Sequence, residues 1–295
     1  MTTSSLFNDR RALVLGGGVS SGNAWLLGVV AGLAAAGLDV TTADLIVGTS
    51  AGSTAAAMIT SATPAELYDA TISAVVPATP PVNRISGAVS DQLSRTQRII
   101  DSSDGISEMR RRMGAAAIEL DNAEGGVGSA RWRGVVERRL PSQEWPEQRI
   151  LLTAVDAHTG EPVAFDCDSG VDLADAVAAS CAGGPAYRIG DRQYIDGGYR
   201  ANADNADLAA GCGRVLVLSP FGGATRVPLN WHVDLASQID ELRRQGSRVE
   251  TIFPEGEGLK AFGGNAMDLS ARPPAARAGY AQGQRAAQGL TDFWS

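Results

Sequence analysis

The sequence predicts a three-layer α/β/α fold with a mainly parallel central sheet. Two successive segments near the start of the chain each consist of a short apolar run, a glycine-rich turn and an alanine-rich stretch of helical length. Such strand–turn–helix units build parallel sheets whose two faces are covered by helices. A chain of 295 residues that is 44% hydrophobic is long enough to fill the core of this architecture.

The first unit has a strand over 11–15, three glycines at 16–18 and a helix over 23–36. The second has a strand over 44–47, a sharp turn at 48–52 and a helix over 53–61. Both strands are apolar after a charged first residue, Arg11 or Asp44. This pattern is typical of strands that are buried on both faces of a sheet.

The middle of the chain changes character. Residues 64–148 contain scattered prolines and glycines with mixed helical patterns and no clear strand, so they are expected to form a helical insertion or cap. The predicted elements after it are a strand over 150–155, its hairpin partner over 162–165, a helix over 172–182, a strand over 193–195, a last buried strand over 214–218 and an amphipathic helix over 233–244. No linker or repeat interrupts them, which predicts a single domain over 1–295.

Charge and cysteine content exclude several classes of protein. The net charge of -8 opposes nucleic-acid binding, although ten arginines between Arg84 and Arg139 offer either a local basic face or a solvated helix surface. Cys167, Cys181 and Cys212 form no C-x-x-C pair, so no disulfide framework or metal site is expected. Since no signal peptide or transmembrane segment is readable, a cytoplasmic location is expected.

Gly48-Thr49-Ser50-Ala51-Gly52 matches the motif G-x-S-x-G. The motif lies between a predicted strand and a predicted helix, which is the context in which it carries a nucleophile. So sharp a turn needs flanking residues without bulk, which glycine provides. Ser50 would then face outward at a helix N-terminus, where backbone N–H groups favour developing negative charge.

The glycine run Gly16-Gly17-Gly18 admits three interpretations. Consecutive backbone N–H groups bind either a phosphate or the oxyanion of a tetrahedral intermediate. A dinucleotide-binding loop requires G-x-G-x-x-G, but Ser21 stands where the third glycine belongs and Gly22 comes one residue late. A purely structural tight turn is the third interpretation.

The general base has two candidates. The chain contains only two histidines, His158 and His232, and a Ser–His–Asp triad in the usual chain order would need His232. Asp196 is the alternative, because the following Gly197-Gly198 lets the backbone turn close to a nucleophile without steric conflict. An isolated D-G turn is common, so the pattern at Asp196 alone does not decide between them.

Taken together and in this order, the motifs resemble those of the patatin-like phospholipase family. The hallmarks of that family are a glycine-rich oxyanion loop near the N-terminus, a G-x-S-x-G nucleophile and a D-G-[AG] catalytic aspartate. The similarity to bacterial members extends over most of the chain, through the segments Leu15–Gly22, Ala24-Trp25, Ala176–Ser180, Tyr194–Gly198, Asn205–Leu208, Ala261–Asn265 and Ala275–Arg277.

The resemblance implies a patatin-like fold with a helical cap and a lipid acyl hydrolase that needs no cofactor. It makes Ser50 the nucleophile and Asp196 the general base of a dyad without histidine, with an acyl-enzyme intermediate. The oxyanion hole would be formed by the backbone amides of Gly17 and Gly18. The residues that support these motifs would be Gly16, Gly48, Gly52, Gly197 and Gly198.

One feature of the chain departs from the family pattern. Many relatives carry an arginine in the glycine loop, where this chain has Val19, Ser20 and Ser21.

The expected partner is a lipid or another acyl ester, and the arginine-rich insertion is compatible with transient contact at a membrane surface. The sequence leaves the oligomeric state open. The alternative functions are a Ser–His–Asp esterase that uses His232, a transacylase, and a non-catalytic acyl-lipid or nucleotide-binding protein of the same fold.

Overall fold

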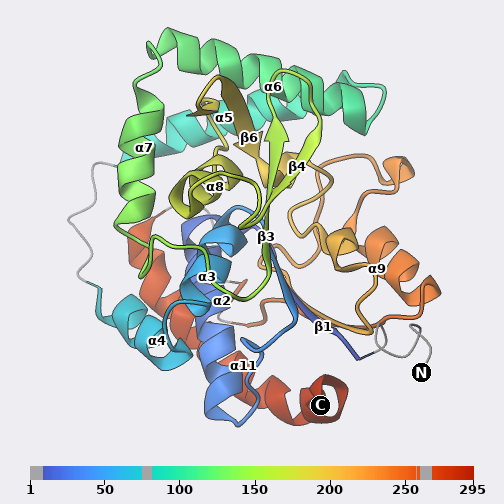
Figure 1. Cartoon of the computed structure of the whole chain (residues 1–295). Helices are drawn as coiled ribbons and strands as arrows, with labels where there is room; N and C mark the ends of the chain where they lie inside the picture. Colours follow the sequence, from blue (N-terminus) through green and yellow to red (C-terminus); the bar gives the residue numbers. More distant parts are fainter. Residues whose placement is uncertain (1–8, 75–81, 257, 260–267) are drawn as a thin grey trace.

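The computed structural model describes residues 9–74, 82–256, 258–259 and 268–295, and its centre is an eight-stranded mixed sheet (Figure 1). The strand order is β5-β6-β3-β2-β1-β7-β8, with β4 paired to β3. In the spatial run β3-β2-β1-β7-β8 each strand is parallel to its neighbour, whereas β4 and β6 are antiparallel to β3. The strands are β1 Arg11–Leu15, β2 Leu45–Gly48, β3 Ile150–Asp156, β4 Pro162–Phe165, β5 Tyr187–Ile189, β6 Arg192–Asp196, β7 Arg214–Leu218 and β8 Arg248–Ile252.

Helices cover both faces of this sheet. Along β1, Leu13 and Leu15 point into the core under α2, α3 and α11, while Ala12 and Val14 point into the core under α9. The alternation of side chains along a strand thus produces the two cores of a three-layer α/β/α fold, which confirms the predicted fold class. The α-helices are α2 Val19–Ala35, α3 Ala51–Ile59, α4 Pro64–Ser73, α5 Val82–Asp101, α6 Ile106–Ala123, α7 Gly128–Glu137, α8 Leu173–Ser180, α9 Leu235–Arg244 and α11 Arg272–Trp294.

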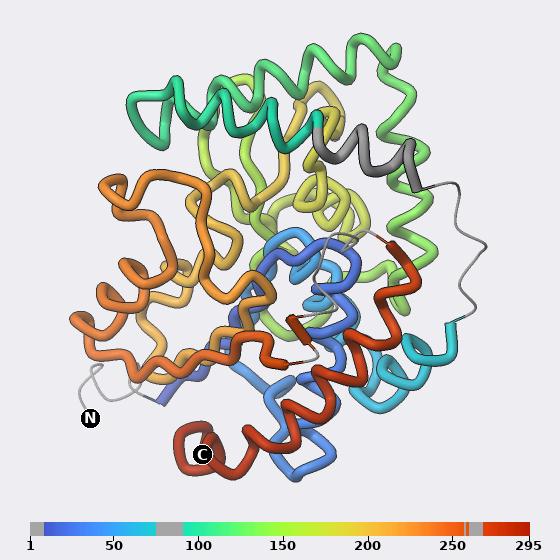
Figure 2. The backbone as a smooth tube through the Cα atoms, turned by 180° about the vertical axis from the view of Figure 1, so that it is seen from behind, coloured from blue at the N-terminus to red at the C-terminus, as the bar shows by residue number. Residues whose placement is uncertain are grey.

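Helix α11 runs along α2, as both views of the backbone show (Figures 1 and 2). The two helices approach so closely that a Cβ added to Gly28 would lie 2.1 Å from the carbonyl oxygen of Ala276. A side chain at this position would force the helices apart, which explains why small residues fill the contact. The pairing brings Arg272, the first residue of α11, beside the first turn of α2.

Most elements lie where the sequence predicts them, and β1 has the predicted bounds. The described residues between α3 and β3 contain helices α4 to α7 and no strand. The expectation that 214–218 is the last strand is wrong, because β8 follows it at the edge of the sheet. In β8, Arg248 and Glu250 alternate with Val249 and Thr251, so this edge strand lacks the apolar run that marks buried strands.

Candidate active site

Strand register brings the G-x-S-x-G turn (Gly48–Gly52) and the D-G-G turn (Asp196–Gly198) to the same level of the sheet. Gly48 at the end of β2 pairs with Leu152 of the parallel neighbour β3. Two residues further along β3, Ala154 pairs with Asp196 at the end of β6. Ser50 lies two residues beyond Gly48, so the hydroxyl and the carboxylate face each other across β3.

The backbone of Ser50 is held in a strained conformation. Its φ of 52° and ψ of -116° place a non-glycine residue in the left-handed half of the Ramachandran plot. Its amide donates to Ser180 Oγ at 2.9 Å, and its carbonyl accepts from Ser53 Oγ at 2.6 Å and from Cys181 Sγ at 3.1 Å. Strain of this kind costs about 1–3 kcal/mol and persists only where the surroundings fix it, as these three contacts do.

Close packing explains the glycine that ends the motif. A Cβ on Gly52 would lie 1.9 Å from the carbonyl oxygen of Leu15, at the end of β1. No rotation of a side chain relieves a clash with backbone, so α3 can begin directly above β1 only with glycine here. The position of the G-x-S-x-G turn relative to the glycine loop therefore depends on Gly52.

Asp196 presents a buried carboxylate to Ser50. Its Oδ1 accepts the amide hydrogen of Gly198 at 2.8 Å, and its carboxylate is in hydrogen-bonding contact with the Ser50 side chain. Burial raises the pKa of Asp196 to about 6, against the opposing effects of these two hydrogen bonds. Although the residue as a whole is partly exposed, protein atoms enclose its carboxylate. A carboxylate in this setting is more basic than in water and remains ionised at neutral pH.

The glycine loop meets Ser50 at Gly17, where an added Cβ would lie 3.5 Å from Ser50 Cβ. The amide of Gly17, however, donates to the carbonyl of Ala203 at 2.7 Å. This bond engages the N–H of Gly17 within the protein, whereas an oxyanion donor needs a free N–H. The amide of Gly18 has no hydrogen-bond partner in the described part of the chain.

Arg272, from the start of α11, reaches the residues that follow the glycine loop. Arg272 donates to the carbonyl of Ser20 at 2.9 Å and to Asn23 Oδ1 at 3.0 Å, at the first turn of α2. Burial and the nearby Arg139 lower the pKa of Arg272 to about 10, so it stays charged at neutral pH. Within the described residues no carboxylate pairs with it.

Neither histidine joins Ser50 and Asp196. His158 pairs with Gln193 through Nε2 at 3.1 Å. His232 lies after β7 and lines a cavity of about 660 Å³ whose walls include neither Ser50 nor Asp196. Of Asp196 and His232, the structure brings Asp196 to Ser50.

Three further residues at the site carried no recognisable sequence pattern. Cys181 contacts the Ser50 carbonyl, and burial raises the pKa of its thiol to about 11, so it is a neutral donor. Burial and Asp196 raise the pKa of Tyr199 to about 12. From α5, Gln92 donates to the carbonyl of Gly183 at 2.7 Å, beside Asp196. Gln92 and Cys181 come from elements other than the two turns, and Tyr199 follows the D-G-G turn as a single aromatic residue, so none of them stands in a motif that spacing could reveal.

Comparison with known proteins identifies a family. The family model described as "Patatin-like phospholipase" matches residues 13–209, which include the glycine loop, the nucleophile turn and the D-G-G turn. No curated protein matches the chain. Among solved structures the type III effector protein ExoU is similar at 12% identity and a TM-score of 0.37, over 94% of this chain and 53% of that protein, so the chain spans about half its length.

None of the helices in the described residues is both long enough and apolar enough to cross a membrane. The segment Ala261–Asn265, part of the sequence resemblance, lies outside the described residues. The family match covers about two thirds of the chain and contains each of the three motifs. The chain therefore belongs to the patatin-like phospholipase family.

Proposed function

We propose that the protein hydrolyses acyl ester bonds of lipids through a Ser50–Asp196 dyad, as a phospholipase A or esterase. The observation that carries this proposal is the contact between the Ser50 hydroxyl and a carboxylate whose pKa burial raises to about 6. A base near the working pH combines a large ionised fraction with a useful affinity for the proton.

In the first half of the reaction Asp196 takes the hydroxyl proton as Ser50 Oγ attacks the acyl carbonyl carbon. The tetrahedral oxyanion collapses, the alcohol leaves with the proton that Asp196 returns, and an acyl ester on Ser50 remains. In the second half Asp196 removes a proton from water, which attacks this ester. The products are a carboxylic acid and the free Ser50 hydroxyl.

The oxyanion is proposed to lie at the glycine loop, with the Gly18 amide as the available donor. The first-turn N–H groups of α2 follow directly and add the positive end of a 17-residue helix. One such donor contributes about 10²–10³ in turnover. Gly17 is proposed to contribute shape instead, since a side chain there would point at Ser50.

A substrate with an anionic head group is favoured by Arg272. Among the residues that the structure describes, this partly buried guanidinium meets carbonyl and amide oxygens and no carboxylate, so its charge is incompletely compensated there. A phosphate near the start of α2 would neutralise it through charge-assisted hydrogen bonds. This supports a phospholipid rather than a neutral ester as the natural substrate.

We further propose that residues 1–295 act as one domain and that the insertion over about 64–148 forms a cap. Helix α5 supports this, because Gln92 contacts Gly183 beside Asp196, and Arg226 donates to Thr96 Oγ1 of the same helix at 2.8 Å. Within the insertion, Arg133 is engaged by a carboxylate of the main body, Asp175 of α8. The cap would therefore shape the entrance to the site more than it would present a basic face.

The test is hydrolysis of a phospholipid and of a short acyl ester by wild type, Ser50→Ala, Asp196→Ala and His232→Ala, with fluorophosphonate labelling in parallel. Ser50→Ala is expected to lose both labelling and turnover, and Asp196→Ala to lose turnover. His232→Ala is the matched control and should behave as wild type. A His232→Ala protein as inactive as Ser50→Ala would establish a histidine triad, and absence of labelling in wild type would favour a binding protein.

A further inference from the structure

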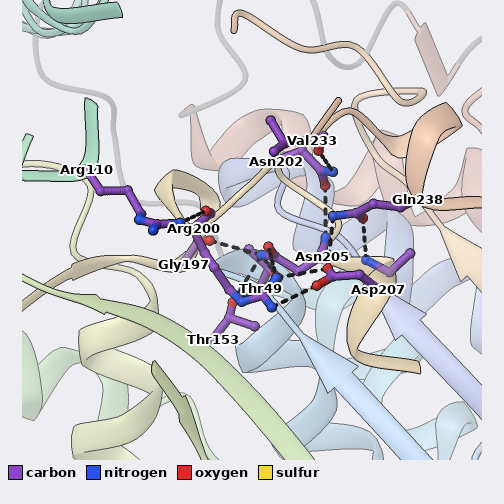
Figure 3. A network of polar contacts seen from close by, with 11 residues as sticks. Thr49, Arg110, Thr153, Gly197, Arg200, Asn202, Asn205, Asp207, Val233 and Gln238 are labelled. Atoms are coloured by element: carbon purple, nitrogen blue, oxygen red, sulfur yellow. Dashed lines mark hydrogen bonds and ion pairs between the residues drawn. The ribbon is translucent and has the colours of Figure 1, made fainter. Parts of the chain in front are cut away.

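The two turns of the proposed dyad are tied together by a buried side chain that touches neither reacting group. Asn205 follows the D-G-G turn and is fully buried, with a left-handed backbone (φ 54°, ψ 41°). Its carboxamide lies between Thr49 of the G-x-S-x-G turn, the nucleophile turn of the proposed dyad, and Gly197 of the D-G-G turn (Figure 3). This position makes Asn205 a candidate for controlling the distance between them.

Each polar atom of the carboxamide has a partner. Nδ2 donates to Thr49 Oγ1 at 3.0 Å and to the carbonyl of Gly197 at 2.9 Å, while Oδ1 accepts from Arg200 at 3.1 Å. Thr49 is the residue directly before Ser50, and Gly197 is the residue directly after Asp196. One rigid planar group thus bridges the immediate neighbours of both proposed catalytic residues.

The groups around the bridge hold it in one place. Asn202 Oδ1 accepts the backbone amide of Asn205 at 2.9 Å, and Thr153 donates to Thr49 Oγ1 at 2.9 Å. A Cβ on Gly197 would lie 2.1 Å from Thr153 Oγ1, so the D-G-G turn packs closely against Thr153. Arg200 is fixed in turn by its ion pair with Asp207. A buried network whose members fix one another in this way is rigid.

We infer that Asn205 is a positioning residue for the dyad, whose carboxamide sets the separation of the nucleophile turn and the base turn. The inference rests on the proposed function for its catalytic consequence. Only a carboxamide provides two donors and one acceptor in this geometry. An aspartate would place a carboxylate oxygen against the Gly197 carbonyl and add a buried negative charge near Asp196.

The variants separate this role from a structural one. Asn205→Gly removes the carboxamide but accepts the left-handed backbone, and His232→Gly is its matched control, since His232 is also left-handed (φ 53°) and lies away from the dyad. Thr49→Val and Thr49→Ser test the other end of the bridge, because only serine keeps the hydroxyl. The Thr49 pair remains informative if Asn205→Gly does not fold.

In Asn205→Gly and Thr49→Val, kcat and the rate of fluorophosphonate labelling are expected to fall on the order of 10²-fold, because misplacement by about 1 Å has this effect. KM should stay within about threefold, and Thr49→Ser and His232→Gly should keep near wild-type kcat. In Asn205→Asp the acid limb of the pH profile should move to higher pH, since like charge raises a carboxyl pKa. Cys181 and Tyr199, which lie near Asp196, have pKa values of about 11 and 12 and do not titrate in this range. Asp204, directly before Asn205, has a pKa that burial raises to about 7, so the pH profiles are compared in proteins that also carry Asp204→Asn.

The inference is overturned if folded Asn205→Gly and Thr49→Val keep wild-type kcat, or if only KM changes. Failure of the proposed function would look different. In that case Ser50→Ala would still hydrolyse the substrate, while the Asp196 carboxyl, followed by NMR titration, would still respond to Asn205→Asp. An Asp196 titration unchanged in that variant would refute the bridge itself.

Discussion

Asp204 presses its carboxylate against the glycine loop, with Oδ1 only 2.2 Å from the place that a Cβ of Gly16 would occupy. This oxygen is buried and has no hydrogen-bond partner among the described residues. Burial raises the pKa of Asp204 to about 7, and contact with Ser219 lowers it only in part. A largely protonated carboxyl therefore lies under the loop at slightly acid pH.

This burial predicts a pH dependence of stability. Between about pH 4 and pH 7 the unfolded chain has lost the Asp204 proton while the folded protein retains it, so stability falls as pH rises, by up to about 1.4 kcal/mol per pH unit. Asp196 acts in the same direction up to about pH 6. Thermal unfolding of Asp204→Asn should show a smaller loss of Tm between pH 4.5 and pH 7.5 than wild type. Equal losses in the two proteins would refute the assignment.

The base assignment makes a separate prediction about activity. Because Asp196 must be ionised to accept the Ser50 proton, kcat/KM should rise about tenfold per pH unit up to about pH 6 and then level off. The measurement is kcat/KM for a neutral short-chain ester from pH 4.5 to 8. A profile that is flat across pH 5–7 would exclude Asp196 as the group that controls turnover.

Val19 stores strain at the start of α2. Its φ of 51° is left-handed, a conformation that costs a residue other than glycine about 1–2 kcal/mol. Val19→Gly removes that cost but adds about 0.5–1 kcal/mol of unfolded-state entropy, so Tm should rise by on the order of 2 °C. Val127→Gly is the control, since Val127 has an ordinary φ of -84° and should gain nothing. A lower Tm for Val19→Gly would show that the strain estimate is wrong.

The sequence predicted the parts of the site that local chemistry determines. Gly52 and Ser50 were recognisable because a sharp strand-to-helix turn needs a glycine and an exposed hydroxyl at fixed spacing. The direction of the Gly17 amide was not predictable, because it depends on the Ala203 carbonyl, which tertiary packing brings to the loop. The same holds for Asn205, whose role arises from strand register that places two distant turns at one height.

The fold was predictable to a similar extent. Buried strands such as β1 have an apolar run that marks them in the sequence, whereas β8 at the edge does not. Helix α11 was not predicted, since its contact with α2 depends on small residues such as Gly28 rather than on an apolar stripe. This helix is also what delivers Arg272 to the site.

Arg272 allows the substrate class to be tested separately from the chemistry. Arg272→Gln should raise KM for an anionic phospholipid on the order of tenfold, because a charge-assisted hydrogen bond contributes about 1.5–3 kcal/mol. KM for a neutral short-chain ester should change less than twofold. For each substrate, kcat of Arg272→Gln should be close to that of wild type, since the guanidinium contacts Ser20 and Asn23 rather than Ser50. Arg277→Gln, on the next turn of α11, is the matched control and should leave both KM values unchanged. Equal increases in KM for the neutral and the anionic substrate would indicate that Arg272 acts by supporting the first turn of α2, and a phosphate group would then have no special partner in this site.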